Sequence, residues 1–154
     1  MKNLLKFLFV FLALSLAITS CDDDDDDNRN PEITNLELGS GHDGDSRNNA
    51  TAYPGRDIHV AADVFAKNKI EKVVITIHEE EHHHAGTKAE GTEEWETTVE
   101  YKDYEGQLNA KFHKHIDIPK NAEPGDYHFH FKVVDKQGLT TEVNRELKVL
   151  AKKK

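Results

Sequence analysis

The sequence predicts an all-β fold, an antiparallel β-sandwich of about seven short strands, within residues 31–150. Apolar and polar residues alternate with a period of two in several segments, and turn-forming residues separate those segments. No segment carries apolar residues at helical spacing. The chain has 154 residues, of which 36% are hydrophobic and 32% are charged, so it fits one ordinary domain with a modest core.

Each strand is predicted from its own apolar positions. These positions are Ile33, Leu36 and Leu38 in the first; Ile58, Val60, Ala62 and Val64 in the second; Val73, Ile75 and Ile77 in the third; Trp95, Thr97, Val99 and Tyr101 in the fourth; Leu108, Ala110, Phe112, Ile116 and Ile118 in the fifth; and Tyr127, Phe129, Phe131 and Val133 in the sixth. Residues 139–150 form the seventh.

Seven short strands in about 120 residues fit an immunoglobulin-like sandwich. In that arrangement the first, second, fourth and fifth strands form one sheet, and the third, sixth and seventh form the other. The core should contain ten inward-facing residues: Val60, Val64, Val73, Ile75, Ile77, Phe112, Tyr127, Phe129, Phe131 and Val133.

Residues 1–20 have the pattern of a bacterial secretory signal peptide. Lys2 and Lys6 flank the start of an apolar run, residues 4–17, that is too short for a stable spanning helix. The next residues, Ile18-Thr19-Ser20-Cys21, resemble a lipobox. The resemblance implies cleavage before Cys21, diacylation of its thiol and acylation of its new amino group, with palmitate as an expected acyl chain. An ordinary cleavage site followed by a stray thiol is the alternative.

Residues 21–30 are predicted to join the lipidated Cys to the sandwich through an acidic tether. Six consecutive aspartates repel one another and stay solvated and extended: Asp22, Asp23, Asp24, Asp25, Asp26 and Asp27. Their position resembles the acidic export signal of Bacteroidota surface lipoproteins, which implies a lipid-anchored outer-membrane protein facing the cell exterior. A plain spacer or a weak calcium-binding tail is the alternative.

Two segments resemble a known group of proteins. Phe112-His113-Lys114-His115-Ile116-Asp117-Ile118-Pro119 and Pro124-Gly125-Asp126-Tyr127-His128-Phe129-His130-Phe131 are similar to signatures of a Bacteroidota lipoprotein family of uncharacterised function. The second segment, with Asp135-x-x-Gly138, also resembles the penultimate strand and last hairpin of bacterial immunoglobulin-like domains. The similarity covers roughly residues 31–150. It implies a surface-exposed lipoprotein with a His-rich immunoglobulin-like domain, and no known activity.

The composition is unusual in its histidine content: the chain has ten histidines but only one Met, one Trp and one Cys. Strand parity and antiparallel order place all ten at one end of the sandwich, in two sets on the outer faces of the two sheets. Neutral imidazole is a common ligand of zinc, copper and nickel, and two histidines at i and i+2 on one strand can reach one ion. The first set is His78, His128 and His130 with His82, His83 and His84; the second is His59, His113 and His115, with His42 as a further candidate.

The sequence therefore predicts a surface lipoprotein that captures or buffers a transition metal, with zinc, copper or nickel as the cation. The alternatives are metal-independent adhesion, binding of an outer-membrane protein, a host protein or a glycan, a pH-sensitive surface, haem capture, and a pure scaffold whose exposed histidines bind nothing. Few aromatic side chains are expected at the surface, which gives glycan binding little support: Tyr53, Phe65, Tyr104 and Trp95.

Charge and missing motifs argue against other function classes. Beyond residue 20 there are 18 basic and 29 acidic residues, a net charge of −11, which argues against nucleic acid as a partner. No G-x-S-x-G elbow or Gly-rich phosphate loop is present, so no catalytic residue and no enzymatic activity is predicted. Residues 41–46 have the composition of a calcium loop, but Arg47 stands where a third ligand is expected. Residues 151–154 form a basic tail.

Overall fold

The computed structural model describes residues 29–41, 47–80 and 91–151, and these residues form eight β-strands. They are β1 (Glu32–Gly39), β2 (Thr51–Ala52), β3 (Asp57–Phe65), β4 (Ile70–Glu79), β5 (Thr97–Tyr101), β6 (Asn109–Asp117), β7 (Gly125–Asp135) and β8 (Thr140–Val149). The predicted signal peptide, Cys21 with the six aspartates, and the histidines His42, His82, His83 and His84 lie outside the described residues.

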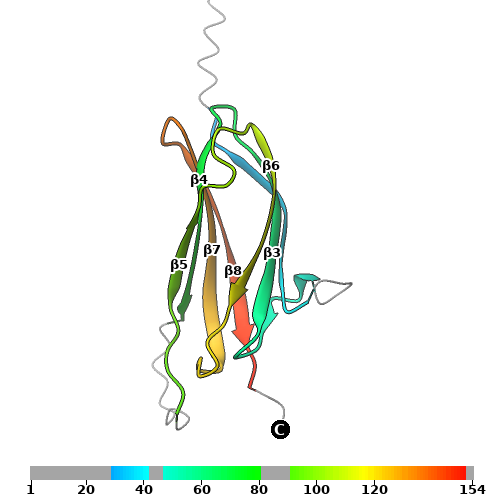
Figure 1. Ribbon diagram of the computed structural model, residues 1–154, viewed down its shortest axis with the longest axis vertical. Coiled ribbons are helices and arrows are strands. Elements are labelled where there is room, and N and C mark those ends of the chain that lie inside the picture. Colours follow the sequence, from blue (N-terminus) through cyan, green and yellow to red (C-terminus); the bar gives the residue numbers. More distant parts are fainter. Residues whose placement is uncertain (1–28, 42–46, 81–90, 152–154) are drawn as a thin grey trace, which may run out of the picture.

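The strands form two sheets that pack as a sandwich. One sheet has the order β1-β3-β6 and the other β2-β8-β7-β4-β5. Every pairing is antiparallel except the short one between β2 and β8. Figure 1 shows β3 and β6 in one layer and β4, β5 and β7 in the other. The predicted all-β sandwich is confirmed.

The fourth predicted strand lies in a different sheet from the one expected. β5 pairs with β4, with Val99 opposite Ile75, so it extends the five-stranded sheet instead of joining β1, β3 and β6. The alternation of residues 97–101 predicts one half-buried face, and that face packs equally well in either sheet. Tyr101 reaches the core from this edge, with its ring centroid 5.2 Å from that of Phe112. The additional strand β2 is only two residues long, too short to show a period.

The ten predicted core residues are all buried, each with 3% exposure or less. Phe112 of one sheet meets Phe131 of the other edge-on across the core, with ring centroids 5.0 Å apart. Trp95, expected at the surface, is buried at 7% exposure and packs against Tyr127. Among the described residues, the whole hydrophobic core lies between Leu36 and Val149. Residues 29–154 therefore contain what the sandwich needs to fold.

Tyr127 ties the start of β7 to the chain that precedes it. Its ring is buried, and its hydroxyl donates to the carbonyl of Glu123 at 2.8 Å. This contact is the tyrosine corner of immunoglobulin-like sandwiches, in which a Tyr near the start of this strand bonds the backbone a few residues upstream. Burial, reinforced by the negative charge of Glu79, raises the pKa of Tyr127 to about 12.

Tyr127→Phe is expected to lower the free energy of unfolding near neutral pH by about 0.5–1.5 kcal/mol, because one hydrogen bond is lost. An unfolded tyrosine ionises near pH 10. Because the pKa of Tyr127 is raised in the fold, its contribution is fully present below about pH 10 and is lost as the pH rises toward 12. Urea unfolding from about pH 9 to about pH 11 should show the wild-type advantage shrinking. A constant difference would contradict the burial of the Tyr127 hydroxyl that raises its pKa.

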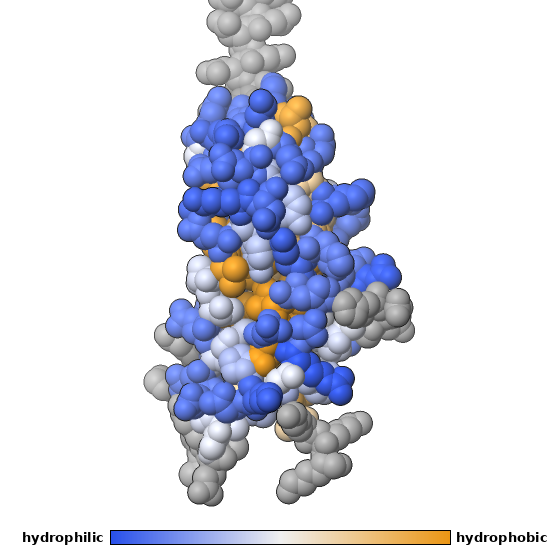
Figure 2. Space-filling model, in the orientation of Figure 1, coloured by the Kyte–Doolittle hydropathy of each residue, from blue (hydrophilic) through white to orange (hydrophobic). Residues whose placement is uncertain are grey.

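The surface is mainly polar. Figure 2 shows one face covered mostly by hydrophilic residues, with hydrophobic residues visible in a strip through its middle and in a small patch near the top. In the part of the chain that the structure describes, Leu108 is the exposed large hydrophobic residue, at 46% exposure. The same part contains no helix that is long and apolar enough to cross a membrane.

Candidate metal centre

Three histidines meet on the outer face of the three-stranded sheet. β3 and β6 pair with His59 directly opposite His115. Because alternate residues of a strand point to opposite faces, Phe112 and Ile116 enter the core while His113 and His115 point outward. The ring centroids of His59, His113 and His115, here called the histidine triad, lie 5.0–5.6 Å apart.

The nitrogens of the histidine triad are spaced for one ion. One ring nitrogen from each histidine lies within 4.8 Å of one from each of the others. His113 Nε2 and His115 Nε2 are 3.3 Å apart. Two nitrogen ligands at about 2.0–2.1 Å from a tetrahedral ion are about 3.3–3.4 Å apart, so the two β6 rings already match that geometry. Three protein ligands leave the fourth tetrahedral position open for water or another ligand.

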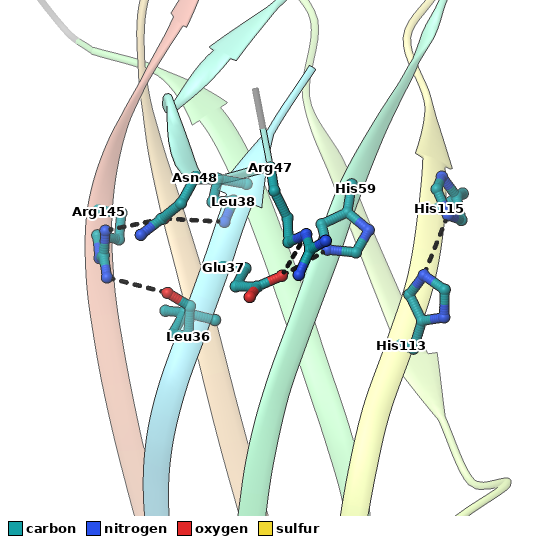
Figure 3. Close-up of polar contacts among 9 residues, drawn as sticks. All are labelled: Leu36, Glu37, Leu38, Arg47, Asn48, His59, His113, His115 and Arg145. Atoms are coloured by element: carbon teal, nitrogen blue, oxygen red, sulfur yellow. Dashed lines mark hydrogen bonds and ion pairs between the residues drawn. The ribbon is translucent and has the colours of Figure 1, made fainter. Parts of the chain in front are cut away.

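His59 is the buried member of the triad, at 6% exposure. Glu37 of β1 lies over it, with Oε2 3.0 Å from His59 Nε2, and Arg47 Nε is 3.5 Å from the same oxygen. Figure 3 shows Glu37 and Arg47 on one side of the His59 ring and the two β6 histidines on the other. The polar contacts of β1 and residue 47 therefore fix the orientation of the most buried ring.

Two carboxylates set the protonation pattern of the triad. Asp57 Oδ2 lies 2.7 Å from His115 Nδ1, as Glu37 lies against His59 Nε2. A carboxylate oxygen accepts hydrogen bonds, so His115 Nδ1 and His59 Nε2 donate. In the neutral rings, His115 Nε2 and His59 Nδ1 then carry the lone pairs. This carboxylate–histidine arrangement is the one that orients metal-binding imidazoles in proteins.

The second predicted set lies on the outer face of the five-stranded sheet. His78 of β4 is opposite His128 of β7, and His130 lies two residues further along β7. His78 Nε2 and His130 Nε2 are 3.0 Å apart. The His128 ring centroid is 5.3 Å from that of His78, and its Nε2 is 3.9 Å from Glu80 Oε1. The structure therefore gathers the strand members of both predicted sets.

The six described histidines share one end of the sandwich but not one face. His59 is near the start of β3 and His78 near the end of β4, and a short turn joins the other ends of these strands. His115 is near the end of β6, and His128 and His130 are near the start of β7. The two sets face outward from opposite sheets with the core between them, so they form two separate clusters. The prediction for His42, His82, His83 and His84 stays open.

Sequence reasoning missed the carboxylates and polar groups that orient these rings. Asp57 and His59 are two residues apart on one strand, so their side chains lie on the same face of the sheet, and the sequence alone allowed this inference. Glu37 reaches His59 only through the β1–β3 register, which shifts at a bulge between Thr34 and Glu37. Glu142 lies on β8 beside His130, and no spacing in the sequence indicates that contact.

Comparison with known proteins gives a family without an assigned role. A family model described as "Domain of unknown function (DUF4625)" matches residues 19–150. The match covers the sandwich and extends over Cys21 and the six aspartates. No curated protein matches the chain.

Proposed function

We propose a function from the side chains themselves, since the chain belongs to DUF4625, a family of unknown function. The protein is a lipid-anchored surface protein of the outer membrane that captures or buffers a transition metal at the histidine triad. The observation that carries the proposal is the set of three imidazole nitrogens within 4.8 Å of one another, supplied by two paired strands.

The chemistry of the triad favours zinc. Neutral imidazole binds zinc, copper and nickel, and a three-His set with an open fourth position is a known zinc arrangement. The 3.3 Å separation of His113 Nε2 and His115 Nε2 fits tetrahedral ligands. Asp57 and Glu37 hold two of the rings and bring negative charge close to the cation. An open fourth position suits exchange of the ion, as capture or buffering requires.

The strand order supports an outward-facing site. Glu32, where β1 begins, pairs with Phe65, whereas Gly39 at the other end of β1 pairs with His59. The chain thus enters the sandwich at the end opposite the histidines. If Cys21 anchors the protein through the acidic tether, the triad lies at the end farther from the membrane. Metal ions in the surrounding medium then reach it directly.

Calorimetric titration of residues 29–154 with zinc tests the metal proposal. His82, His83 and His84 should be replaced by serine in this background, because a His-rich tract can chelate metal by itself. We expect one zinc ion at the triad, with an affinity that falls as the pH is lowered, because protonated imidazole cannot bind a metal ion. Absence of binding in this background would leave metal-independent binding of a partner as the better function.

Cys21→Ala is expected to abolish lipidation and membrane attachment, because the thiol and its new amino group carry the acyl chains. Metabolic labelling with a fatty acid, followed by separation of membrane and soluble fractions, measures both effects. Cys21→Ser serves as a second variant with nearly the same side-chain volume and the same expected loss. Equal labelling of wild type and both variants would show that lipidation does not occur at this residue.

A further inference from the structure

The outer face of the five-stranded sheet carries a histidine pair with a geometry unlike that of the triad. His78 and His130 stack almost parallel, with ring centroids 5.1 Å apart and an interplanar angle of 17°. Their Nε2 atoms face each other at 3.0 Å. Both rings are partly buried, and they come from adjacent strands, β4 and β7.

The other nitrogen of each ring faces hydrogen-bond acceptors. His78 Nδ1 lies 3.0 Å from the carbonyl oxygen of Glu79, which can only accept. His130 Nδ1 lies 2.9 Å from Glu142 Oε1 and 2.9 Å from Asn144 Oδ1. Each Nδ1 therefore donates, and in the neutral rings both Nε2 atoms present lone pairs to each other. Two facing lone pairs repel unless a positive charge lies between them.

We propose that His78 and His130 form a second cation site, separate from the triad, that takes copper(II) in preference to zinc. For two nitrogens 3.0 Å apart with metal bonds of about 2.0–2.1 Å, the angle at the ion is about 91–97°. That angle is typical of tetragonal copper(II) and nickel(II) sites, and copper(II) binds nitrogen ligands more tightly than nickel(II) or zinc. The triad spacing of 3.3 Å, by contrast, fits a tetrahedral ion.

Two more side chains of ligand type lie near this pair, although among the described residues only the triad has three ligand atoms within 4.8 Å of one another. The His128 ring is 5.3 Å from that of His78, and Glu80 Oε1 lies 3.9 Å from His128 Nε2. A shallow groove opens beside His130, lined also by Glu142, Thr76 and Thr98. Glu142 and the Glu79 carbonyl are positioning groups, since they hold Nδ1 protonated and leave Nε2 for the ion. The groove gives an ion access from solvent to the His130 side of the pair; His78 does not line it.

The pair and the triad have no ligand in common. They point outward from opposite sheets, which in a sandwich lie about 10 Å apart with the core between them. The second site does not rest on the proposed function of the triad. A protein with both sites binds two ions per chain, and each site can be removed while the other stays intact.

Copper(II) titration followed by electron paramagnetic resonance tests the pair. The protein is residues 29–154 with serine at 82–84 and with His113→Ala and His115→Ala, so that the triad is absent. We expect one copper(II) ion with resolved nitrogen splitting. Adding His78→Ala and His130→Ala removes both proposed ligands and should abolish binding of this ion together with the nitrogen splitting. Lys136→Ala, beyond the end of β7, is the control: it removes only an exposed ion pair with Glu105 and should leave the copper affinity and the nitrogen splitting unchanged.

Two further measurements separate a loss of metal binding from a loss of folding, and a failure of the pair from a failure of the triad. His130→Asn is a second, less disruptive variant, and circular dichroism of each metal-free protein shows that it is folded. With the triad restored, zinc titration of the His78→Ala/His130→Ala variant reports on the triad alone, so failure of either site is recognised separately. If the triad-free protein gives no nitrogen-split copper signal, the pair holds a shared proton instead of a metal ion and the proposal is wrong. The same holds if its signal survives loss of the pair.

Discussion

His113→Ala combined with His115→Ala is expected to abolish the stabilisation of the sandwich by zinc. The two substitutions remove two of the three triad nitrogens, the Nε2 atoms that lie 3.3 Å apart. A ligand that binds only the native state stabilises it by mass action, by about 2.7 kcal/mol at 100 times its dissociation constant. Thermal unfolding followed by circular dichroism, with and without zinc, measures the effect. The metal-free variant should unfold near the wild-type temperature, because both side chains are exposed.

Matched variants separate coordination from general surface effects. Lys111→Ala alters the next outward position on the same strand and removes only an exposed ion pair with Asp63, which contributes little stability. It should keep the full zinc effect. Asp57→Asn keeps the side-chain volume but weakens the support of His115, and should reduce zinc affinity by about 10- to 100-fold. A wild-type response in the double variant would exclude the triad as the metal site.

The tract His82, His83 and His84 offers a competing explanation for any metal binding by the whole chain. If the tract alone carries the affinity, replacing these three residues with serine removes zinc binding, and the strand variants behave like wild type. If the triad carries it, the serine replacement leaves a site that depends on His113 and His115. Combining the two sets of substitutions in one series decides between a flexible chelator and a site built by the folded sheet.

The sequence predicted the core because burial in a sandwich follows strict alternation. Phe129 and Phe131 alternate with His128 and His130, and the structure places the first pair inside and the second outside. The sheet that receives β5 was not predictable in this way, because alternation specifies a buried face and not a neighbouring strand. For the same reason, Trp95 precedes β5 with a pattern that allows an exposed or a buried position.

The two histidine clusters were predictable from strand parity and strand order. Which cluster brings three ligand nitrogens close together was not predictable. From the sequence, His78, His128 and His130 with the loop histidines were expected to be the most compact set. The three-way convergence of ligand nitrogens occurs instead around His59, because His115 stands directly opposite it and His113 stands diagonal to it across the β3–β6 pairing. Distances between ring nitrogens depend on rotamers, and these depend on Glu37 and Asp57, whose contacts arise only from the folded register.

Phe129→Ala is expected to lower the free energy of unfolding by about 3–5 kcal/mol, the usual cost of truncating a buried Phe. Phe129 is fully buried in the centre of the five-stranded sheet, where it lies between Ile77 of β4 and Arg145 of β8. Because small domains are stable by only about 5–15 kcal/mol, the loss is a large share of the total. Urea unfolding should show a lower midpoint with an unchanged slope.

His128→Ala on the opposite face of β7 is the control for Phe129→Ala and should cost little in the absence of metal. The Phe129 variant also tests whether the triad is independent of this part of the core, since His59, His113 and His115 lie on the other sheet. At a zinc concentration of about 100 times the dissociation constant, zinc should still raise the free energy of unfolding of the Phe129 variant by about 2.7 kcal/mol. This gain adds to the lower free energy of unfolding of the metal-free variant. Loss of the increment in a variant that is still folded would show that the triad depends on packing in the five-stranded sheet, and the assignment of its geometry to β3 and β6 alone would be wrong.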